Sequence, residues 1–387
     1  MKTGVVVIGG GAIGASVAYW LRVHPKACPV VVIERDSTYR QASTPRASGG
    51  VRRLFSLPEN ILLSQFSISF FEDFAERMSV NGNAPDIGFK KNGYLFIVPE
   101  ASVRMLSDNY RTQKELGANV VWMDRKALGD KYPSMNVGDL AAAVFSPDDG
   151  WLDPYGVLRG FRQKAQSLGA TFLQDEVIKI ESAGKIVRKV FLKSGPTIEA
   201  DAVVNAAGAW AKDICRMVGA DVPIEPMRRY EHYFESQDPI EPLPYLKDID
   251  RLAFRPEGRG YSGGVVNIDE PRGYHFDVDH HYFESTVWPA LAHRFPAFEK
   301  TRVKNTLPGL YDQNDFDGNA IIGPGVGGLE NFYMAAGFSG HGLMHAPGCG
   351  RALAEMLLDG RYETIDLTRL GWARVVAHRP LPERGII

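Results

Sequence analysis

The sequence lacks features that define several large classes of protein. It contains no apolar stretch of about 18 residues, so we expect no membrane-spanning helix. Its formal net charge is only −2 over 387 residues, which gives no support for a nucleic-acid or anionic-membrane partner. Its cysteines, Cys28, Cys215 and Cys349, are far apart and without metal-ligand spacing. We therefore expect reduced, buried thiols and no metal site.

Two more absences guide the search for domains. The sequence shows no internal repeat and no low-complexity segment, so domain boundaries must come from motifs. The first predicted strand begins close to residue 4, which leaves no room for a signal or transit peptide in this sequence. Together with the unpaired thiols, this predicts a cytoplasmic location.

What the sequence does have is a distinctive beginning, GVVVIGGGAIGASVAYWLRVHPKACPVVVIER at residues 4–35. Val5–Ile8 and Val30–Ile33 are apolar runs that suit buried parallel strands and are too short for helices. Between them, Ala12–Val23 predicts a helix rich in small residues. A strand, a glycine-rich turn, a helix and a second strand together predict a unit that binds a dinucleotide.

The glycines of this unit have separate tasks. Gly9 makes a tight turn, Gly11 lets the backbone approach a pyrophosphate, and Gly14 lets the helix pack closely on the strand. The anion then lies at the helix N-terminus, where N–H groups and the dipole favour negative charge. Glu34 follows the second strand and is placed to accept hydrogen bonds from ribose hydroxyls. An acid there disfavours a 2′-phosphate, so FAD or NAD remain.

Three later segments are also expected to contribute to the dinucleotide-binding site. Residues 41–51 (QASTPRASGGV) are small and polar, which suits backbone lying against a ligand, although a plain surface loop is the alternative. Val177 and the turn at Ala206–Gly208 are expected to border the adenosine half. Gly337–Met344 is a second glycine-rich turn, before a helix predicted from about Ala346 to Leu358. Such a helix N-terminus supplies the positive site that a flavin needs near N1 and C2=O.

These motifs resemble the D-amino acid oxidase/sarcosine oxidase family, and most closely its FAD-dependent oxidoreductase domain-containing branch. VVVIGGGAIG, VVNAAGAWA and AAGFSGHGLMHAPGCG carry the resemblance, in that order along the chain. It implies an α/β fold with a discontinuous Rossmann-like FAD-binding domain and an antiparallel-sheet α+β substrate domain. The expected FAD-binding segments are 1–80, 145–225 and 305–387, and the expected substrate-domain segments are 81–144 and 226–304.

The motifs and the resemblance together predict the residues that hold FAD. They are Gly9, Gly11, Ala12, Ile13, Gly14, Glu34, Arg35, Ser43, Thr44, Ser48, Gly49, Gly50, Val177, Ala206, Gly208, Trp210, Gly337, Gly340, His341, Gly342, Leu343 and Met344. No cysteine lies near Tyr311, where the monomeric sarcosine oxidases link their flavin, so we expect non-covalent FAD.

The resemblance implies oxidation of the carbon–nitrogen bond of an amino acid or N-substituted amine. Hydride passes to flavin N5 and leaves an imine that hydrolyses. Arg52 or Arg53 is expected to hold a substrate carboxylate, because a guanidinium offers a bidentate fork. If both instead form surface ion pairs, the carboxylate partner must be sought among other arginines, namely Arg228, Arg229, Arg255 and Arg259. The remaining candidates are pocket-shaping Tyr261 and Tyr311, and His341, which would position substrate or polarise the flavin.

The resemblance implies an electron acceptor, which is expected to be oxygen, a quinone or an electron-transfer protein. Met344 stands where sarcosine oxidase has a lysine, and no lysine occurs between Lys247 and Lys300. The reduced flavin would then lack a cationic partner for oxygen, so we predict faster re-oxidation by a quinone or artificial acceptor. Two other readings stay open: a flavin-stabilised accessory protein with little turnover, and an NAD-dependent dehydrogenase.

Overall fold

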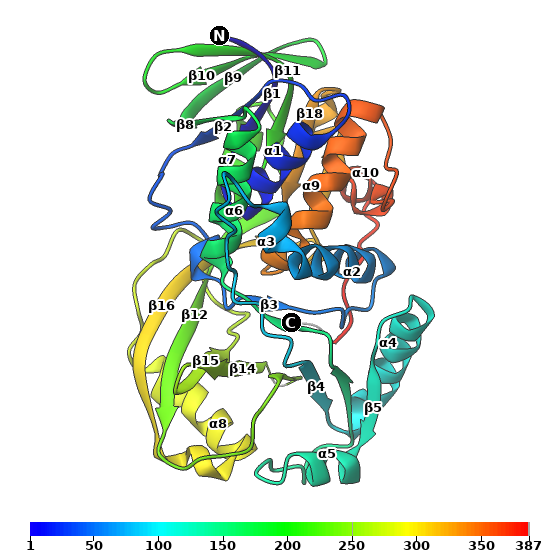
Figure 1. Ribbon diagram of the computed structural model, residues 1–387, viewed down its shortest axis with the longest axis vertical. Coiled ribbons are helices and arrows are strands. Elements are labelled where there is room, and N and C mark those ends of the chain that lie inside the picture. The colour runs from blue at the N-terminus through cyan, green and yellow to red at the C-terminus, as the bar shows by residue number, and fades with distance from the viewer. Residues whose placement is uncertain (250, 386–387) are drawn as a thin grey trace.

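The computed structural model describes residues 1–249 and 251–385 and consists of two sheet-based regions joined by long strands (Figure 1). In the view of Figure 1, the upper region holds a mainly parallel sheet with helices packed on it, and the lower region holds an antiparallel sheet. Strands β12 (Ile224–Ser236) and β16 (Thr301–Asn314) run from the junction of the two regions into the lower one. The junction is therefore where residues from both sheets meet.

The first sheet has the strand order β17-β18-β11-β1-β2-β8. Its five parallel strands are β1 (Lys2–Ile8), β2 (Val30–Glu34), β8 (Thr171–Gln174), β11 (Thr197–Asn205) and β18 (Phe332–Ala336). β17 (Ile321–Pro324) pairs antiparallel with β18, and the hairpin of β9 (Val177–Ala183) and β10 (Ile186–Leu192) pairs with β11. Ile8 is in register with Ile33 and Asn205, so the carboxyl ends of three strands lie together.

Helices cover this sheet on the side of its larger apolar core. They are α1 (Ala12–Val23), α2 (Pro58–Glu72), α3 (Phe74–Arg77), α6 (Pro154–Ser167) and α9 (Gly342–Asp359). α1 packs against α6 and α9. At the α1–α9 contact, a Cβ on Gly350 would lie 2.3 Å from Ser16 Oγ, so only glycine allows the two helices to approach so closely. A second apolar cluster lies on the opposite side, with α7 (Ala211–Arg216) and α10 (Ala373–Val376).

The second sheet has the order β16-β12-β15-β14-β13-β4-β6-β5. Its other strands are β4 (Tyr94–Val98), β5 (Val121–Asp124), β6 (Ala142–Ser146), β13 (Tyr245–Asp248), β14 (Leu252–Glu257) and β15 (Gly260–Val265). All pairs are antiparallel except β13 with β4. α8 (Trp288–Arg294) and α5 (Arg125–Lys131) belong to the core on one face, and α4 (Val103–Glu115) to the core on the other. A two-stranded sheet, β3 (Gly50–Val51) with β7 (Gly150–Trp151), lies at the junction.

The structure confirms the opening strand–helix–strand unit and corrects two helices. The helix predicted from Pro58 to about Met78 is interrupted at Asp73, where α2 gives way to the short α3. The helix predicted from about Ala346 begins four residues earlier, at Gly342, so Pro347 lies inside it rather than in its first turn. Strands of the first sheet come only from the three segments expected for FAD binding, whereas β6, β12 and β16 each cross an expected boundary.

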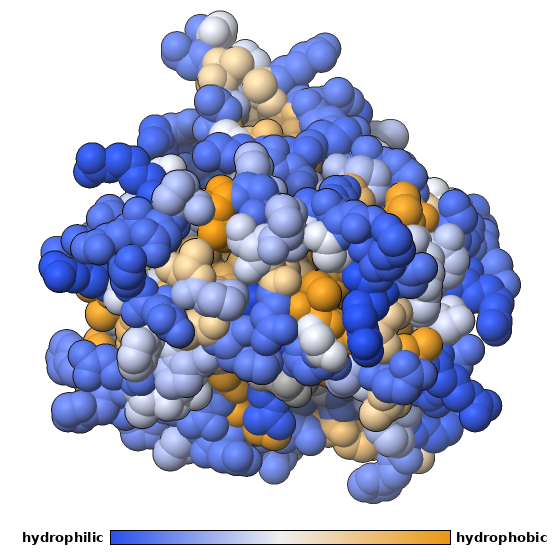
Figure 2. All heavy atoms as spheres, turned by 90° about the horizontal axis from the view of Figure 1, so that it is seen from below, coloured by the Kyte–Doolittle hydropathy of each residue, from blue (hydrophilic) through white to orange (hydrophobic). Residues whose placement is uncertain are grey.

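The outer face of the lower region is mainly hydrophilic. Figure 2 shows it from below, with small apolar groups separated by polar and charged side chains. Among the described helices, none is both long and apolar enough to cross a membrane. The described residues also hold no group of three or more His, Cys, Asp or Glu side chains that could bind a metal.

Candidate functional site

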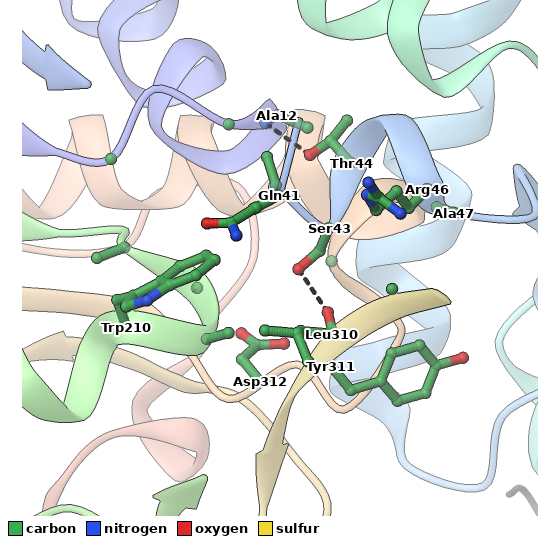
Figure 3. A pocket seen from close by; sticks show the side chains of 18 of the residues that line it. Ala12, Gln41, Ser43, Thr44, Arg46, Ala47, Trp210, Leu310, Tyr311 and Asp312 are labelled. Atoms are coloured by element: carbon green, nitrogen blue, oxygen red, sulfur yellow. Dashed lines mark hydrogen bonds between the residues drawn. The ribbon is translucent and has the colours of Figure 1, made fainter. Parts of the chain in front are cut away.

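A cavity of about 350 Å³ lies at the junction of the two sheets (Figure 3). Its size lies in the range of sites for small molecules and cofactors. Some of the residues in each of the segments 8–13, 33–48, 175–177, 206–217, 229–231, 264–266, 309–312 and 338–343 line it, together with Tyr245 and Ala253. One end, the nucleotide end, is built by the first sheet and its loops; the other, the substrate end, is built by the second sheet.

The nucleotide end begins at the N-terminus of α1. Gly9 has φ +100°, and a Cβ there would lie 2.4 Å from Ala206 O, so the turn requires glycine. A Cβ on Gly14 would lie 1.9 Å from Gly9 O, which explains the close helix–strand packing although Gly14 does not line the cavity. A Cβ on Gly11 would meet only Thr44 Oγ1, at 3.5 Å, so the space before Gly11 belongs to the cavity.

Glu34 stands at the end of β2 with both carboxylate oxygens engaged. Oε2 accepts a hydrogen bond from Gly10 N at 2.8 Å, and Oε1 accepts one from Asp36 N at 2.9 Å. Burial raises the pKa of this carboxyl, while the two backbone donors favour its ionised form. Each oxygen keeps a lone pair for a ribose hydroxyl, the role predicted for Glu34.

The loop at residues 41–48 connects the two ends. Ala12 N donates to Thr44 Oγ1 at 3.2 Å, and Ser43 Oγ donates to Leu310 O on β16 at 2.6 Å (Figure 3). Ser48 also lines the cavity. Gly49 and Gly50 do not, because their backbone is engaged with Leu152 and with β7.

A second helix N-terminus, that of α9, faces the same cavity through Gly340, Gly342 and Leu343. The turn before α9 is held by Asp312, whose Oδ2 accepts from Gly337 N at 2.7 Å and Phe338 N at 3.1 Å. Burial raises the pKa of Asp312 to about 6. Gly337 itself packs on Ile224 and lies outside the cavity lining.

These features fit a flavin dinucleotide. The first turns of α1 and α9 contain no acidic residue, so both positive helix ends remain available to a ligand. α1, Gly11 and Glu34 would take the pyrophosphate and ribose. α9 would take the N1–C2=O edge of the flavin. Other predicted FAD contacts also line the cavity: Ile13, Arg35, Val177, Ala206, Gly208 and Trp210.

The substrate end is a wall of side chains from the second sheet. Arg229 and Glu231 lie two residues apart on β12 and so project from the same face of the strand. Tyr245 on β13 and Tyr311 on β16 complete the wall, and the predicted role of Tyr311 in shaping the pocket agrees with this position. The Tyr311 ring packs so close to Gly340 that a Cβ there would lie 2.4 Å from it. Tyr311 therefore brings the sheet wall into contact with the turn before α9.

Arg229 is a cavity-lining arginine that has no acidic partner among the described residues. Its guanidinium lies 5.0 Å from the Tyr311 ring centre and donates to the backbone oxygens of Arg228 and Asn267. Its Nε is buried without a hydrogen-bond partner, and Arg229 forms no ion pair within the described part of the chain. Burial lowers the pKa of this guanidinium, which stays charged near neutral pH. A partly buried cation with an unpaired N–H group is a site for an anionic group.

The structure does not place Arg52 or Arg53 in the cavity lining, so neither stands where a substrate carboxylate was expected. Arg53 forms an ion pair with the fully buried Asp149, with Nη1 and Oδ1 2.8 Å apart. Arg52 is 2% exposed and donates to Leu54 O at 2.9 Å. It lies behind Tyr94, whose ring stacks on the cavity-lining Tyr245 at 4.3 Å.

Three other predicted residues also lie outside the lining. The His341 side chain turns to Arg52, with Nε2 and Nη2 3.0 Å apart, and burial together with the Arg52 charge lowers the pKa of the imidazole. Met344 is buried in the apolar core beneath α9. Tyr261 packs in the core on the far face of the second sheet, with its ring 4.9 Å from that of Phe298. Sheet packing, the alternative reason for an aromatic there, explains Tyr261.

The second sheet also carries a lysine that the prediction about oxygen did not consider. Lys247 lies on β13, in register with Ala253 and Phe96, just before the lysine-free stretch. Burial, followed by the charges of Arg52 and Arg229, lowers its pKa well below the ordinary value. Lys247 is not among the residues that line the cavity, so the preference of the reduced flavin for oxygen or for another acceptor stays a prediction.

Sequence reasoning did not single out Glu231, Tyr245 or Asp312, and it named Arg229 only as a reserve. Alternation along β12 was the available signal, because Arg229 and Glu231 alternate with His232 and Phe234, which face the opposite core. Which face of that strand meets the cavity depends on pairing with β15 and β16, and no local pattern reveals it.

Comparisons with known proteins give a consistent result. A sequence model of the family described as "FAD dependent oxidoreductase" matches residues 4–356. "FAD-dependent oxidoreductase domain-containing protein 1" of Xenopus laevis is 36% identical over 427 residues, covering 100% of this chain and 85% of that protein. Human mitochondrial sarcosine dehydrogenase is 28% identical over 380 residues, covering 93% of this chain and 40% of that protein. The crystal structure of L-proline dehydrogenase from P. horikoshii superposes with a TM-score of 0.85 at 27% identity, covering 98% of this chain and 99% of that one.

Proposed function

Because this chain belongs to the FAD dependent oxidoreductase family, we propose that it oxidises the carbon–nitrogen bond of an amino acid or N-substituted amine that carries a carboxylate. Bound FAD supplies the hydride acceptor for this reaction. The substrate carbon gives up a hydride, the nitrogen gives up a proton, and the resulting imine is hydrolysed by water to a carbonyl compound and an amine.

The position of Arg229 is the observation that carries the proposal. Arg229 is a partly buried, cavity-lining cation without an acidic partner among the described residues, and its Nε is buried without a hydrogen-bond partner. A substrate carboxylate would pair with it and satisfy the free Nε. The reacting carbon would then lie between Arg229 and the α9 turn, with Tyr311 fixing the distance between them.

Glu231 is suited to take the proton from the substrate nitrogen. It lines the same wall, and its Oε1 accepts a hydrogen bond from Ser262 Oγ at 2.6 Å. Burial raises the pKa of Glu231, which makes this carboxylate a better base than an exposed one. A cation for the carboxylate and an anion for the ammonium complement a zwitterionic amino acid.

The names of two similar proteins favour a secondary amine. Sarcosine and L-proline, named in the sarcosine dehydrogenase and L-proline dehydrogenase above, are both secondary amino acids. We further propose that FAD is held non-covalently, because the described cavity lining contains neither cysteine nor histidine that could form a link. Acid precipitation should then release all yellow colour into the supernatant, and colour in the pellet would contradict this.

The test is anaerobic reduction of the flavin by paired compounds that differ in the carboxylate. Sarcosine and L-proline are compared with dimethylamine and pyrrolidine, and loss of flavin absorbance is followed. We expect bleaching by at least one carboxylate compound and none by its partner amine. Equal bleaching by the amines would contradict the proposal that Arg229 binds a substrate carboxylate. No bleaching across a wider panel of N-methyl and imino acids would favour an accessory protein, and a colourless protein that reduces NAD would favour a dehydrogenase of that class.

A further inference from the structure

Residues 266–282, here called the crossing segment, leave β15 in the second sheet and cross to the nucleotide end. The segment begins at Val266, which lines the cavity, and ends before α8. Gly273 N donates to Pro226 O on β12 at 2.8 Å. Arg272 forms an ion pair with Asp315, which follows β16, with Nη2 and Oδ1 2.7 Å apart. The segment is thus attached at points that border the cavity.

The most specific attachment is to Trp210, which contacts both Arg35 and Tyr274. The Arg35 guanidinium lies 3.7 Å from the centre of the Trp210 ring, and the Tyr274 ring stacks against Trp210 with centroids 5.4 Å apart and planes 9° apart. The Tyr274 hydroxyl also donates to Asp213 on α7. Arg35, Trp210 and Asp213 all line the nucleotide end, whereas Tyr274 does not. Tyr274 therefore fixes the cavity wall from behind.

The crossing segment also closes the outer side of the nucleotide end. Phe276 and Val278 line a second cavity that shares Asp36, Gln41 and Arg46 with the main one. The Arg46 guanidinium lies 5.7 Å from the Phe276 ring centre. Without this segment, the wall made by Gln41 and Arg46 would face solvent on that side.

We propose that the crossing segment is a flap that retains the cofactor, with Tyr274 as its positioning residue. Tyr274 stacks on Trp210 and does not line the cavity, so it would act by holding Trp210 in place for the adenosine half of bound FAD. The segment begins in the second sheet, which forms the substrate end, and contacts residues of the nucleotide end. A part of the chain that belongs to the substrate end would therefore help to keep the cofactor bound. This inference depends on FAD binding and not on which substrate is oxidised.

The stack predicts a measurable difference between two variants. An aromatic pair contributes about 0.5–1.5 kcal/mol beyond buried area, which corresponds to roughly a 2- to 12-fold change in affinity. Tyr274→Ala should therefore weaken FAD binding by several-fold, mainly through faster release. Tyr274→Phe keeps the ring and should restore binding to within about twofold of wild type. The Tyr274 side chain is 44% exposed, so neither change opens a core cavity.

The experiment removes FAD from wild type and variants, titrates it back by flavin fluorescence, and measures release by stopped flow. His280→Ala, an exposed position on the same segment, is the matched control and should bind FAD as wild type does. Wild-type affinity in Tyr274→Ala, or an equal loss in Tyr274→Phe or His280→Ala, would overturn the proposal. Since the titration needs no substrate, failure of the proposed reaction leaves this result intact. With saturating FAD, Tyr274→Ala should be reduced by substrate at the wild-type rate, and a slower rate would overturn a role confined to retention.

Discussion

The two ends of the cavity present different chemical groups to a ligand. At the nucleotide end, backbone N–H groups at the start of α1 and a carboxylate at the end of β2 face the ligand. At the substrate end, the ligand faces long side chains from the second sheet, among them Arg229 and Tyr311. A site made of backbone is harmed by added volume, whereas a site made of side chains is harmed by lost charge. Mutations at the two ends should therefore have separable effects.

The largest effect is expected just outside the substrate end, at the Arg53–Asp149 ion pair. Removing one partner of a buried ion pair costs about 3–5 kcal/mol, because the other charge stays buried and uncompensated. Arg53→Gln should lower the free energy of unfolding by about that amount, leaving substrate KM unchanged. Denaturant unfolding and steady-state kinetics measure the two quantities. The double variant Arg53→Gln, Asp149→Asn should recover part of the lost stability. A raised KM with normal stability in Arg53→Gln would instead show that Arg53 contacts the substrate.

A change at Gly11 should remove the cofactor with the fold retained. No protein atom except Thr44 Oγ1 lies near the position of a Cβ there, so a valine points into ligand space. Overpacking of this kind costs up to about 3 kcal/mol, or roughly 150-fold in affinity. We expect Gly11→Val to purify without flavin and with a wild-type circular dichroism spectrum. Gly14→Val is the contrasting variant, because its side chain would meet Gly9 O and should damage the fold itself. A full flavin spectrum in Gly11→Val would show that this turn does not hold FAD.

A smaller effect is expected in the pH dependence of the free energy of unfolding, through His345 on α9. Burial, followed by the charge of Arg52, lowers the pKa of His345 on α9 from 6.5 to about 3. The unfolded chain takes up a proton near pH 6.5 and the folded chain does not, so the stability is present above that pH and is lost as pH falls. The expected loss is about 2 kcal/mol between pH 7.5 and 5. His345→Asn, which keeps a group able to hydrogen-bond Ser64, should reduce this dependence by the share of His345 and leave the share of the buried His341; an unchanged slope would contradict the assignment.

The contrast between the ends also explains what the sequence could predict. Gly9, Gly11 and Glu34 lie within one strand–helix–strand unit, so their spacing alone indicated their position and task. Arg229, Tyr245 and Tyr311 come from three strands whose neighbours are set by long-range pairing. Arg52 and Arg53 seemed suitable because arginines bind carboxylates, but burial behind Tyr94 and pairing with Asp149 are properties of the folded chain. Tyr261 was predicted to shape the pocket, but the two faces of β15 have different surroundings. One face packs in the core, where Tyr261 lies, and the other lines the cavity.

The central claim is that Arg229 binds a substrate carboxylate at one end of the cavity, and that FAD binds independently at the other end. The direct measurement is a flavin-absorbance titration of FAD-loaded wild type and Arg229→Gln with furan-2-carboxylate, a flat anion without an oxidisable amine, and with the uncharged furan-2-carboxamide. A charge-assisted contact is worth at least about 1.5 kcal/mol, so the variant should bind the carboxylate about tenfold or more weakly. Its affinities for the amide and for FAD should be unchanged. If Arg229→Gln binds the carboxylate as tightly as wild type, the substrate end does not work as described.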